Sequence, residues 1–202
     1  MSDPTADASP FARVDLAPTP ADERGGAGVI VRGRALLGQL NLRGNAQDPG
    51  FAAAVRGAVG VDVPIAPNTV KEAPGNIVYW LGPDEWLVVT EGARTAVVER
   101  DLRAALAGLH FAVTDVSGGQ AVVELRGRNV RDVLAKGCPL DLHPRVFGVG
   151  QCAQSHLAKG QILIRQLDRE PAFEIIVRRS FADYLWLWLE DAAAEYGLEN
   201  HG

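Results

Sequence analysis

The residues of this chain that could do chemistry are few, and the first of them form a glycine run near the N-terminus. Gly25-Gly26-Ala27-Gly28 precedes an apolar stretch, and glycine-rich loops can bind phosphate through their backbone N–H groups. A loop of that kind has to follow a strand and open a helix. Here a segment rich in Pro, Ala, Asp and Gly comes before the run and a strand is expected after it. The pattern therefore argues against a nucleotide site.

Three acidic residues are candidates for proton transfer. Asp84 and Glu85 are neighbours in an expected tight turn, where carboxylates usually bond to the local backbone and face water. Asp115 is expected in a strand close to a turn, where it would accept hydrogen bonds from nearby amides. We predict a structural role for all three carboxylates.

The cysteines and histidines also lack the spacing of a site. Cys138 and Cys152 have no CxxC neighbour, and the histidines show no metal-ligand spacing (His110, His143, His156 and His201). The chain has no Gly-x-Ser-x-Gly elbow, no HExxH and no P-loop. We therefore predict no catalytic, cofactor-binding or metal-binding residue on this chain. Two reduced thiols would fit a cytoplasmic protein.

Composition restricts the kind of partner. The 202 residues are 47% hydrophobic and 22% charged, which is ordinary for a globular protein large enough to bury a core. The formal net charge of −5 argues against nucleic acid or an anionic membrane as the partner. The chain has no apolar run of membrane-spanning length and its N-terminus lacks the features of a secretory signal.

Local patterns predict the elements that must position any site. Residues 1–28 are expected to be a flexible N-terminal arm, because they bury too little apolar surface to offset the ordering entropy. Asp48 and Pro49 are suited to cap and open a helix. Elements expected in the first half are a strand over 37–44, that helix, a hairpin of 77–81 and 86–90 around the turn 82–85, and a helix over 94–106.

The second half repeats this order. Gly118-Gly119 is expected to turn a second hairpin between the strands 111–117 and 120–127. The elements expected after it are a helix over 129–136, strands over 151–157, 161–167 and 173–179, and a helix over 181–196. Leu42-Arg43-Gly44 matches Leu125-Arg126-Gly127, each at a strand end before a helix. We predict an α+β fold of duplicated strand–helix–strand–strand–helix units with antiparallel sheet. The pseudo-repeats, about 36–107 and 111–197, would lie in a single domain over 29–202.

The C-terminal helix is the expected site of interaction. At 100° per residue, one broad face is expected to pack on the sheet (Phe181, Tyr184, Leu185, Trp188, Leu189, Ala192 and Tyr196). Trp186 and Leu187 would then point away from it, towards either a partner or the N-terminal arm. Arg178 and Arg179 precede the helix, where its dipole favours anions, so an acidic partner group would suit them. These four residues are the candidate interface.

Several long runs resemble one family. LGPDEWLVVT (81–90), VTDVSGGQ (113–120), ELRGRNVRDVLAKGCPLDLHPRVF (124–147) and RRSFADYLWLWLEDAAAEYG (178–197) are similar to the gamma-subunit family of heterotetrameric sarcosine oxidase. That family is related to the folate-binding aminomethyltransferase domain. The resemblance extends over residues 36–197 and departs at Gly118-Gly119, where members commonly carry His and Arg. Lys136-Gly137-Cys138 is similar to an element of a folate-dependent iron–sulfur repair protein, but the match ends at Pro139.

The resemblance implies an aminomethyltransferase-like fold and a non-catalytic subunit of an enzyme that oxidatively demethylates sarcosine to glycine. It implies direct packing on an alpha subunit carrying dinucleotide (NAD) and tetrahydrofolate sites. It also implies a beta subunit with flavins (FAD and FMN) and a delta subunit with zinc. Three alternatives stay open: a subunit of a related N-methyl amino-acid dehydrogenase, a folate-binding aminomethyltransferase relative, and a non-enzymatic binding module. A stand-alone aminomethyltransferase normally has additional C-terminal domains, which weakens the second.

Overall fold

The computed structural model describes residues 27–34 and 37–201, and the chain divides into two compact units. Residues 36–118 form one unit, here called the inserted unit. Residues 27–34 and 119–201 form the other, called the flanking unit. The single domain expected over 29–202 would span both units and stays a prediction. Most of the expected arm over 1–28 lies outside the described residues.

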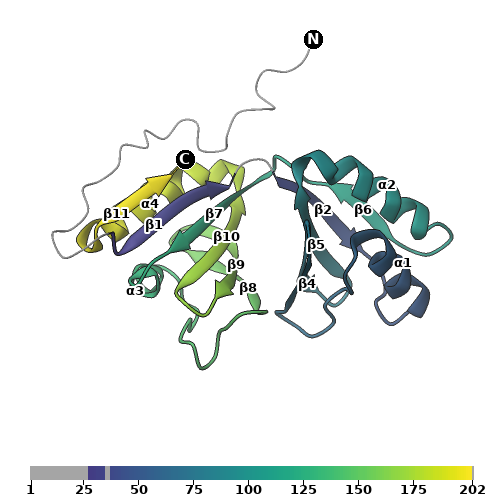
Figure 1. Cartoon of the computed structure of the whole chain (residues 1–202), viewed down its shortest axis with the longest axis horizontal. Helices are drawn as coiled ribbons and strands as arrows, with labels where there is room; N and C mark the ends of the chain where they lie inside the picture. Colours follow the sequence, from purple (N-terminus) through teal and green to yellow (C-terminus); the bar gives the residue numbers. More distant parts are fainter. Residues whose placement is uncertain (1–26, 35–36, 202) are drawn as a thin grey trace, which may run out of the picture. The chain divides into compact units, whose positions relative to one another are not determined.

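The inserted unit is an antiparallel sheet with two helices (Figure 1). Its elements are β2 (Leu37–Arg43), α1 (Pro49–Val59), β3 (Val70–Ala73), β4 (Asn76–Gly82), β5 (Glu85–Glu91), the 3-10 turn η1 (Gly92–Arg94), α2 (Thr95–Ala105) and β6 (Ala112–Asp115). The strand order is β3-β4-β5-β2-β6. Asp48 caps α1 as predicted, because its Oδ1 accepts a hydrogen bond from the N–H of Gly50 at 2.8 Å.

The inserted unit buries its core between the helices and one face of the sheet. Phe51 of α1 packs on Trp86 of β5 with ring centroids 5.7 Å apart, and the Trp86 indole donates to the carbonyl of Pro64 at 2.8 Å. Val98 and Leu102 of α2 join the same cluster. The predicted hairpin at 82–85 is confirmed, with Gly82 paired to Glu85.

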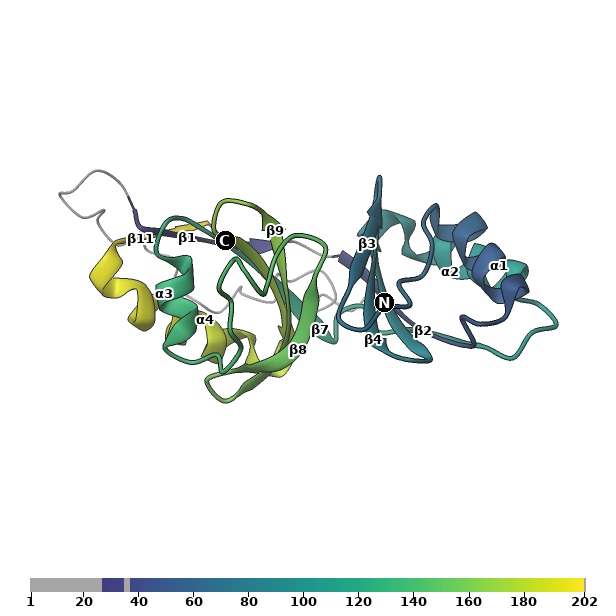
Figure 2. The ribbon, with the colours of Figure 1, turned by 90° about the horizontal axis from the view of Figure 1, so that it is seen from below.

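The flanking unit combines strands from both ends of the chain (Figure 2). Its elements are β1 (Val29–Arg34), β7 (Gln120–Arg126), α3 (Val130–Ala135), β8 (Cys152–Leu157), β9 (Gly160–Asp168), β10 (Ala172–Arg178), the 3-10 turn η2 (Arg179–Phe181), α4 (Ala182–Ala193), the 3-10 turn η3 (Ala194–Tyr196) and β11 (Leu198–His201). The strand order is β11-β1-β7-β10-β9-β8, in which β1 and β11 are parallel.

The predicted duplication is visible in the strand order with one difference, because β1 lies between β7 and β11 whereas β6 pairs directly with β2. In each unit, the strand that precedes the first helix pairs with the last of the three strands that follow that helix. β2 pairs with β5 in the inserted unit, and β7 pairs with β10 in the flanking unit. Gly44 and Gly127 directly follow β2 and β7. Each unit has three strands between its helices, because the short polar β3 joins the two that were expected in the first half. The strand β11 was not predicted from the sequence either.

The predicted hairpin across Gly118-Gly119 is wrong. β6 pairs with β2, whereas β7 pairs with β1 and β10, so the two strands belong to different sheets. Two glycines between apolar strands are compatible with a hairpin and equally with a connection between units. The choice is made by which sheet each strand joins.

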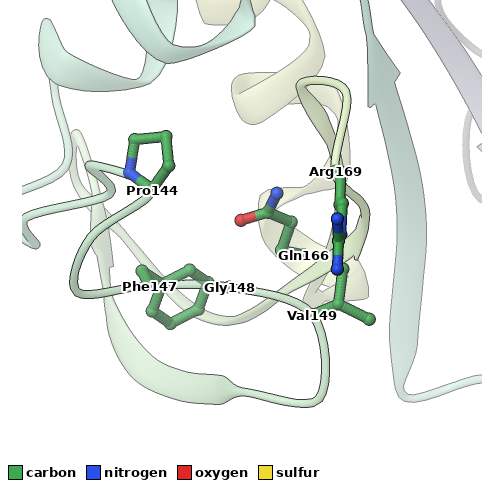
Figure 3. Close-up of a pocket in the computed structure, with 6 residues that line it drawn as sticks. All are labelled: Pro144, Phe147, Gly148, Val149, Gln166 and Arg169. Atoms are coloured by element: carbon green, nitrogen blue, oxygen red, sulfur yellow. The ribbon is translucent and has the colours of Figure 1, made fainter.

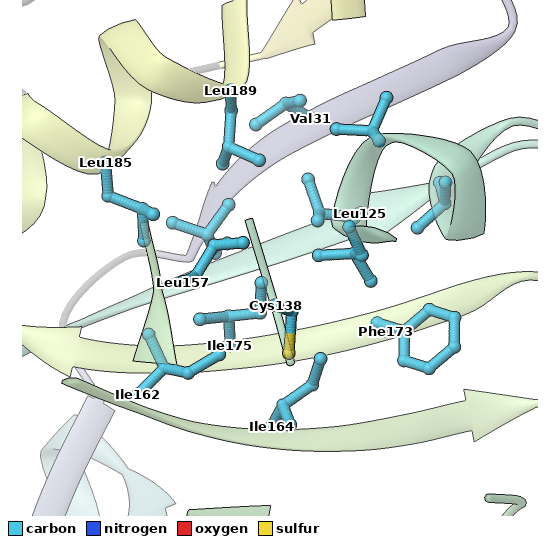
Figure 4. Close-up of a cluster of buried hydrophobic side chains, with 14 of the residues drawn as sticks. Val31, Leu125, Cys138, Leu157, Ile162, Ile164, Phe173, Ile175, Leu185 and Leu189 are labelled. Atoms are coloured by element: carbon cyan, nitrogen blue, oxygen red, sulfur yellow. The ribbon is translucent and has the colours of Figure 1, made fainter. Parts of the chain in front are cut away.

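The core of the flanking unit lies between its sheet and the helices α3 and α4 (Figure 4). Alternate residues of the central strands, such as Val123 and Leu125 of β7, face this core. Leu185 and Leu189 of α4 pack against it from the helix side. Cys138 also lies within the cluster, and both Cys138 and Cys152 are buried free thiols.

Candidate interaction site in the flanking unit

Trp186, the first of the predicted interface residues, is part of the core. Its side chain is fully buried in the cluster of the flanking unit. The indole Nε1 donates a hydrogen bond to Oε1 of Glu190 at 3.0 Å. The prediction that Trp186 points away from the sheet is therefore wrong.

The buried face of α4 is rotated relative to the predicted one. Its buried residues are Ala182, Leu185, Trp186, Leu189, Ala192 and Ala193. Phe181 and Tyr184, which were expected in the core, instead pack edge to face near the surface with centroids 6.2 Å apart. The small residues Ala182 and Ala193 mark the side on which a helix can approach its sheet most closely. The buried face of α4 was predicted wrongly because large side chains were given more weight than alanines.

The other three predicted interface residues have surface positions. Leu187 keeps 58% of its area exposed on α4. Arg178 is exposed at the end of β10, and Arg179 is half-buried, with its backbone N–H donating to the carbonyl of Gly119 at 3.0 Å. Their contact with a partner stays a prediction.

The glycine run has a packing role at its last residue. The N–H of Gly28 donates to the carbonyl of Tyr196 at 2.9 Å, and its carbonyl accepts from the N–H of Asn129 at 3.1 Å. A Cβ on Gly28 would lie 2.6 Å from the Tyr196 carbonyl oxygen. The close approach of these segments accounts for a glycine at this position.

The acidic candidates are engaged in structural bonds. Asp84 forms an ion pair with Arg43 at 3.0 Å, and Glu85 accepts from the Asn41 amide at 2.7 Å. Asp115 accepts from the N–H of Ser117 at 2.8 Å, the strand-end role that was predicted. Asp84 and Glu85 thus bond across the strands to side chains of β2, rather than only to the local turn.

Lys136 holds the C-terminal end of α4. Its Nζ donates to the carbonyl of Ala192 and to Glu195, and it lies 4.8 Å from the ring centroid of Tyr196. The hydrogen bond with Glu195 raises the pKa of Lys136, and the same bond lowers the pKa of Glu195. The neighbouring Gly137 packs on the Trp188 indole. The Lys-Gly-Cys element is structural here.

A charged network crosses the sheet of the flanking unit. Burial raises the pKa of Glu124, but hydrogen bonds and charges from Arg126 and Arg34 outweigh burial and lower it overall. Arg126 also pairs with Asp168 at 2.8 Å, and Arg34 lies 3.2 Å from Glu124. A carboxylate held ionised between two guanidinium groups is a weak base. This network stabilises the sheet and is poorly suited to proton abstraction.

This unit contains a cavity of about 430 Å³ that was not predicted from the sequence (Figure 3). Its lining is Pro144, Phe147, Gly148, Val149, Gln166 and Arg169. Four of the eight residues 143–150 are Pro, Val or Phe, and Val146 and Val149 stand out as apolar residues in a loop. Valines in a loop that also contains Pro and Gly were the available signal.

The described ranges 27–34 and 37–201 contain no cluster of three or more His, Cys, Asp or Glu side chains arranged for a metal. Within the same ranges, no helix combines the length and apolar character that crossing a membrane requires.

Comparisons with known proteins point in one direction. Residues 43–195 match the family described as sarcosine oxidase, gamma subunit family. The sarcosine oxidase subunit gamma of Corynebacterium sp. strain U-96 is 36% identical over 189 residues, covering 93% of this chain and 90% of that protein. The subunit gamma of Corynebacterium sp. strain P-1 is 38% identical over 173 residues, covering 85% and 83%.

The solved structures agree with the sequences. A chain of the heterotetrameric sarcosine oxidase from Corynebacterium sp. U-96, in complex with pyrrole 2-carboxylate, superposes with a TM-score of 0.84 at 35% identity. That match covers 94% of this chain and 95% of the other. Glycine cleavage system aminomethyltransferase T from Bartonella henselae matches with a TM-score of 0.63 at 16% identity, covering 87% of this chain and 48% of that one. The second likeness confirms the predicted aminomethyltransferase-like fold.

Proposed function

The chain belongs to the sarcosine oxidase, gamma subunit family, and we propose on that basis that it is a non-catalytic subunit of a heterotetrameric sarcosine oxidase. The complex would oxidatively demethylate sarcosine to glycine. The observation that carries the proposal is the extent of the likeness, since sequence and fold match gamma subunits over nearly the whole of both chains.

The bonding of the acidic residues supports a structural role for this subunit. A general base has to reach its substrate with a free carboxylate or imidazole. Asp84 and Glu124 are instead paired with arginines, and Asp115 accepts from its own turn. We infer that the chemistry is performed by the other subunits.

The proposed assembly follows the family resemblance. This chain would pack directly on the alpha subunit, and the beta and delta subunits would complete the complex. FAD, FMN, NAD, tetrahydrofolate and zinc would all be held by those partners, with no cofactor on this chain. Leu187, Arg178 and Arg179 are proposed contact residues, and Trp186 is withdrawn from that set because it is buried. A cytoplasmic location is proposed as well, which the free thiols of Cys138 and Cys152 support.

The alternatives have weaker support. The aminomethyltransferase of Saccharopolyspora erythraea is 31% identical over 128 residues, and it covers 62% of this chain and 34% of that protein. A folate-binding role is therefore second to the oxidase assignment. A related N-methyl amino-acid dehydrogenase built from similar subunits differs from the oxidase in its electron acceptor, and assay of the complex separates the two.

The test is purification with and without partners. The tagged chain is expected to recover three further subunits, and the complex is expected to show flavin absorbance and sarcosine-dependent peroxide. The isolated chain is expected to be colourless and to produce no peroxide. A stoichiometric flavin band or turnover by the isolated chain would contradict the non-catalytic role. Recovery of no other subunit would contradict membership of a complex, and sarcosine oxidation without peroxide would favour the dehydrogenase.

A further inference from the structure

We propose that the cavity lined by Phe147, Gln166 and Arg169 receives a peptide segment of a partner subunit, with an apolar side chain next to a carboxylate. The inference rests on the proposed function, because it takes this chain to be a subunit of a complex. It names a contact surface separate from the residues predicted on α4. The carboxylate would be an Asp or Glu side chain, or the chain terminus of the partner.

The wall of the cavity is fixed before any ligand arrives. Phe147 is buried and stacks on Phe173 at a centroid distance of 6.4 Å, and the guanidinium of Arg131 lies 5.3 Å from the Phe173 ring centroid. The N–H of Phe147 donates to the carbonyl of His143 at 3.0 Å. A side chain entering beside Phe147 therefore meets an apolar surface that is already ordered, which lowers the entropic cost of binding.

The loop that forms the rim is also held in place. The N–H of Gly148 donates to Oε1 of Gln151 at 2.6 Å, and the Gln151 N–H returns a hydrogen bond to the Gly148 carbonyl at 3.1 Å. Val149 forms a bridge with Gln166 of β9. A rim closed by reciprocal hydrogen bonds presents its side chains in a defined arrangement.

The apolar surface extends past the cavity. Val146 and Val149 on this rim keep 55% and 54% of their area exposed. A small molecule held in the cavity would leave Val146 in water, because Val146 is not part of the lining. A peptide segment crossing the rim would cover both valines. The exposed valines thus favour a macromolecular partner over a small ligand.

Gln166 provides an unused hydrogen-bond acceptor. The residue is only 4% exposed, and its Nε2 donates to the carbonyl of Asp168 at 2.6 Å, which sets the orientation of the amide. Its buried Oε1 has no hydrogen-bond partner among the described residues. Figure 3 shows this amide directed into the space between Pro144 and Arg169. Because leaving a buried acceptor unpaired is costly, a donor such as a peptide N–H would be favoured here.

Arg169 provides a positive charge at the same opening. Among the described residues its guanidinium has no carboxylate within ion-pair distance, and neighbouring Asp168 is already paired with Arg126 at 2.8 Å. Glu170 follows Arg169 in sequence but does not line the cavity. An unpaired arginine beside an apolar pocket favours a carboxylate, which it can bind through two N–H groups. A hydrogen-bond donor for Gln166, an apolar side chain for Phe147 and a carboxylate for Arg169 together describe a short acidic peptide segment.

The experiment compares two substitutions at the cavity with two matched controls. Arg169→Glu and Val149→Asp are made in the full chain, alongside Lys71→Glu and Ile65→Asp on exposed positions of the inserted unit. Each purified variant is titrated with the complex of the other three subunits, and the dissociation constant is measured. Both cavity variants are expected to bind about tenfold more weakly or worse, whereas the controls stay close to wild type. Arg169→Lys, which keeps the charge, should lose less binding affinity than Arg169→Glu.

Two further measurements test whether the variants are folded and whether the cavity contacts a partner. Thermal melting of each isolated variant shows whether it is folded, and Val149→Ser replaces Val149→Asp if the charged variant is not. A photo-crosslinking amino acid at position 149 is expected to capture a partner peptide that contains Asp or Glu beside an apolar residue.

The outcomes separate the inference from the proposed function. If the wild-type chain binds its partners and folded cavity variants bind equally well, the inference is overturned while the function stands. Crosslinking at 149 to no partner, or to a peptide without a carboxylate, overturns it too. If the wild-type chain binds no partner, both fail.

Discussion

The indole Nε1 of Trp186 lies 3.0 Å from Oε1 of Glu190, one helical turn further along α4. The same carboxylate oxygen accepts a hydrogen bond from Nδ2 of Asn200 on β11 at 3.2 Å. Glu190 thereby satisfies the indole of a buried tryptophan and joins α4 to an edge strand. A buried indole N–H without such a partner would destabilise the fold.

Trp186→Ala is therefore expected to destabilise the chain strongly. Removing the large buried side chain should lower the free energy of unfolding by about 3–5 kcal/mol, because the cavity cannot be refilled completely. Urea denaturation of the purified chain measures this change. Leu187→Ala is the control, since its exposed side chain should shift stability by no more than about 0.5 kcal/mol. Equal effects at the two positions would mean that Trp186 is not packed as described.

Glu124 is expected to make stability depend on acid pH. Its pKa in the folded chain is lowered, so protonation is harder in the folded state than in the unfolded state. The resulting stabilisation is complete above the ordinary glutamate pKa of about 4.3. It is lost as pH falls through the lower pKa of the folded state. Glu124→Gln should therefore be less stable than wild type at neutral pH, and the difference should shrink towards acid pH.

The measurement is the free energy of unfolding of wild type and Glu124→Gln from neutral pH into the acid range. Glu170→Gln is the control, because Glu170 is exposed and forms no ion pair with the described residues. A constant difference between wild type and Glu124→Gln at every pH would show that the two arginines do not lower the Glu124 pKa.

Gly127→Ala is expected to lower the free energy of unfolding by more than the strain of a positive φ alone would explain. Gly127 has φ of +124°, and a Cβ there would lie 2.4 Å from the carbonyl oxygen of Gly28. Gly150 has φ of +84° with open space around its Cβ position. Gly150→Ala should lower the free energy of unfolding by about 1 kcal/mol because of backbone strain. Gly127→Ala should lower it clearly more, because backbone atoms must move apart. Thermal and urea unfolding of both variants test this order, and similar losses would argue against the close contact of Gly127 with Gly28.

Local chemistry in the sequence determined much of the fold. Asp48 followed by Pro49 specifies the start of α1, because the side-chain cap and the preset φ of proline act within a few residues. The turn Gly82-Pro83-Asp84-Glu85 specifies the hairpin of β4 and β5 for the same reason. The assignment of Asp115 to a strand end was also right, since its bond to Ser117 is local. The long family-like runs were sufficient to predict the family.

Tertiary structure decided the pairing of strands and the orientation of α4. β6 and β7 are adjacent in sequence but join different sheets, and β1 pairs with β11 from the other end of the chain. The alternation of side chains along a strand is the same for every partner, so it cannot select one. Trp186 is buried because it belongs, with Leu185 and Leu189, to the face of α4 that packs in the core of the flanking unit. The cavity at Arg169 likewise exists only because loop 143–150 folds back over β9. Each of these depends on residues far apart in sequence, and only folding brings them together.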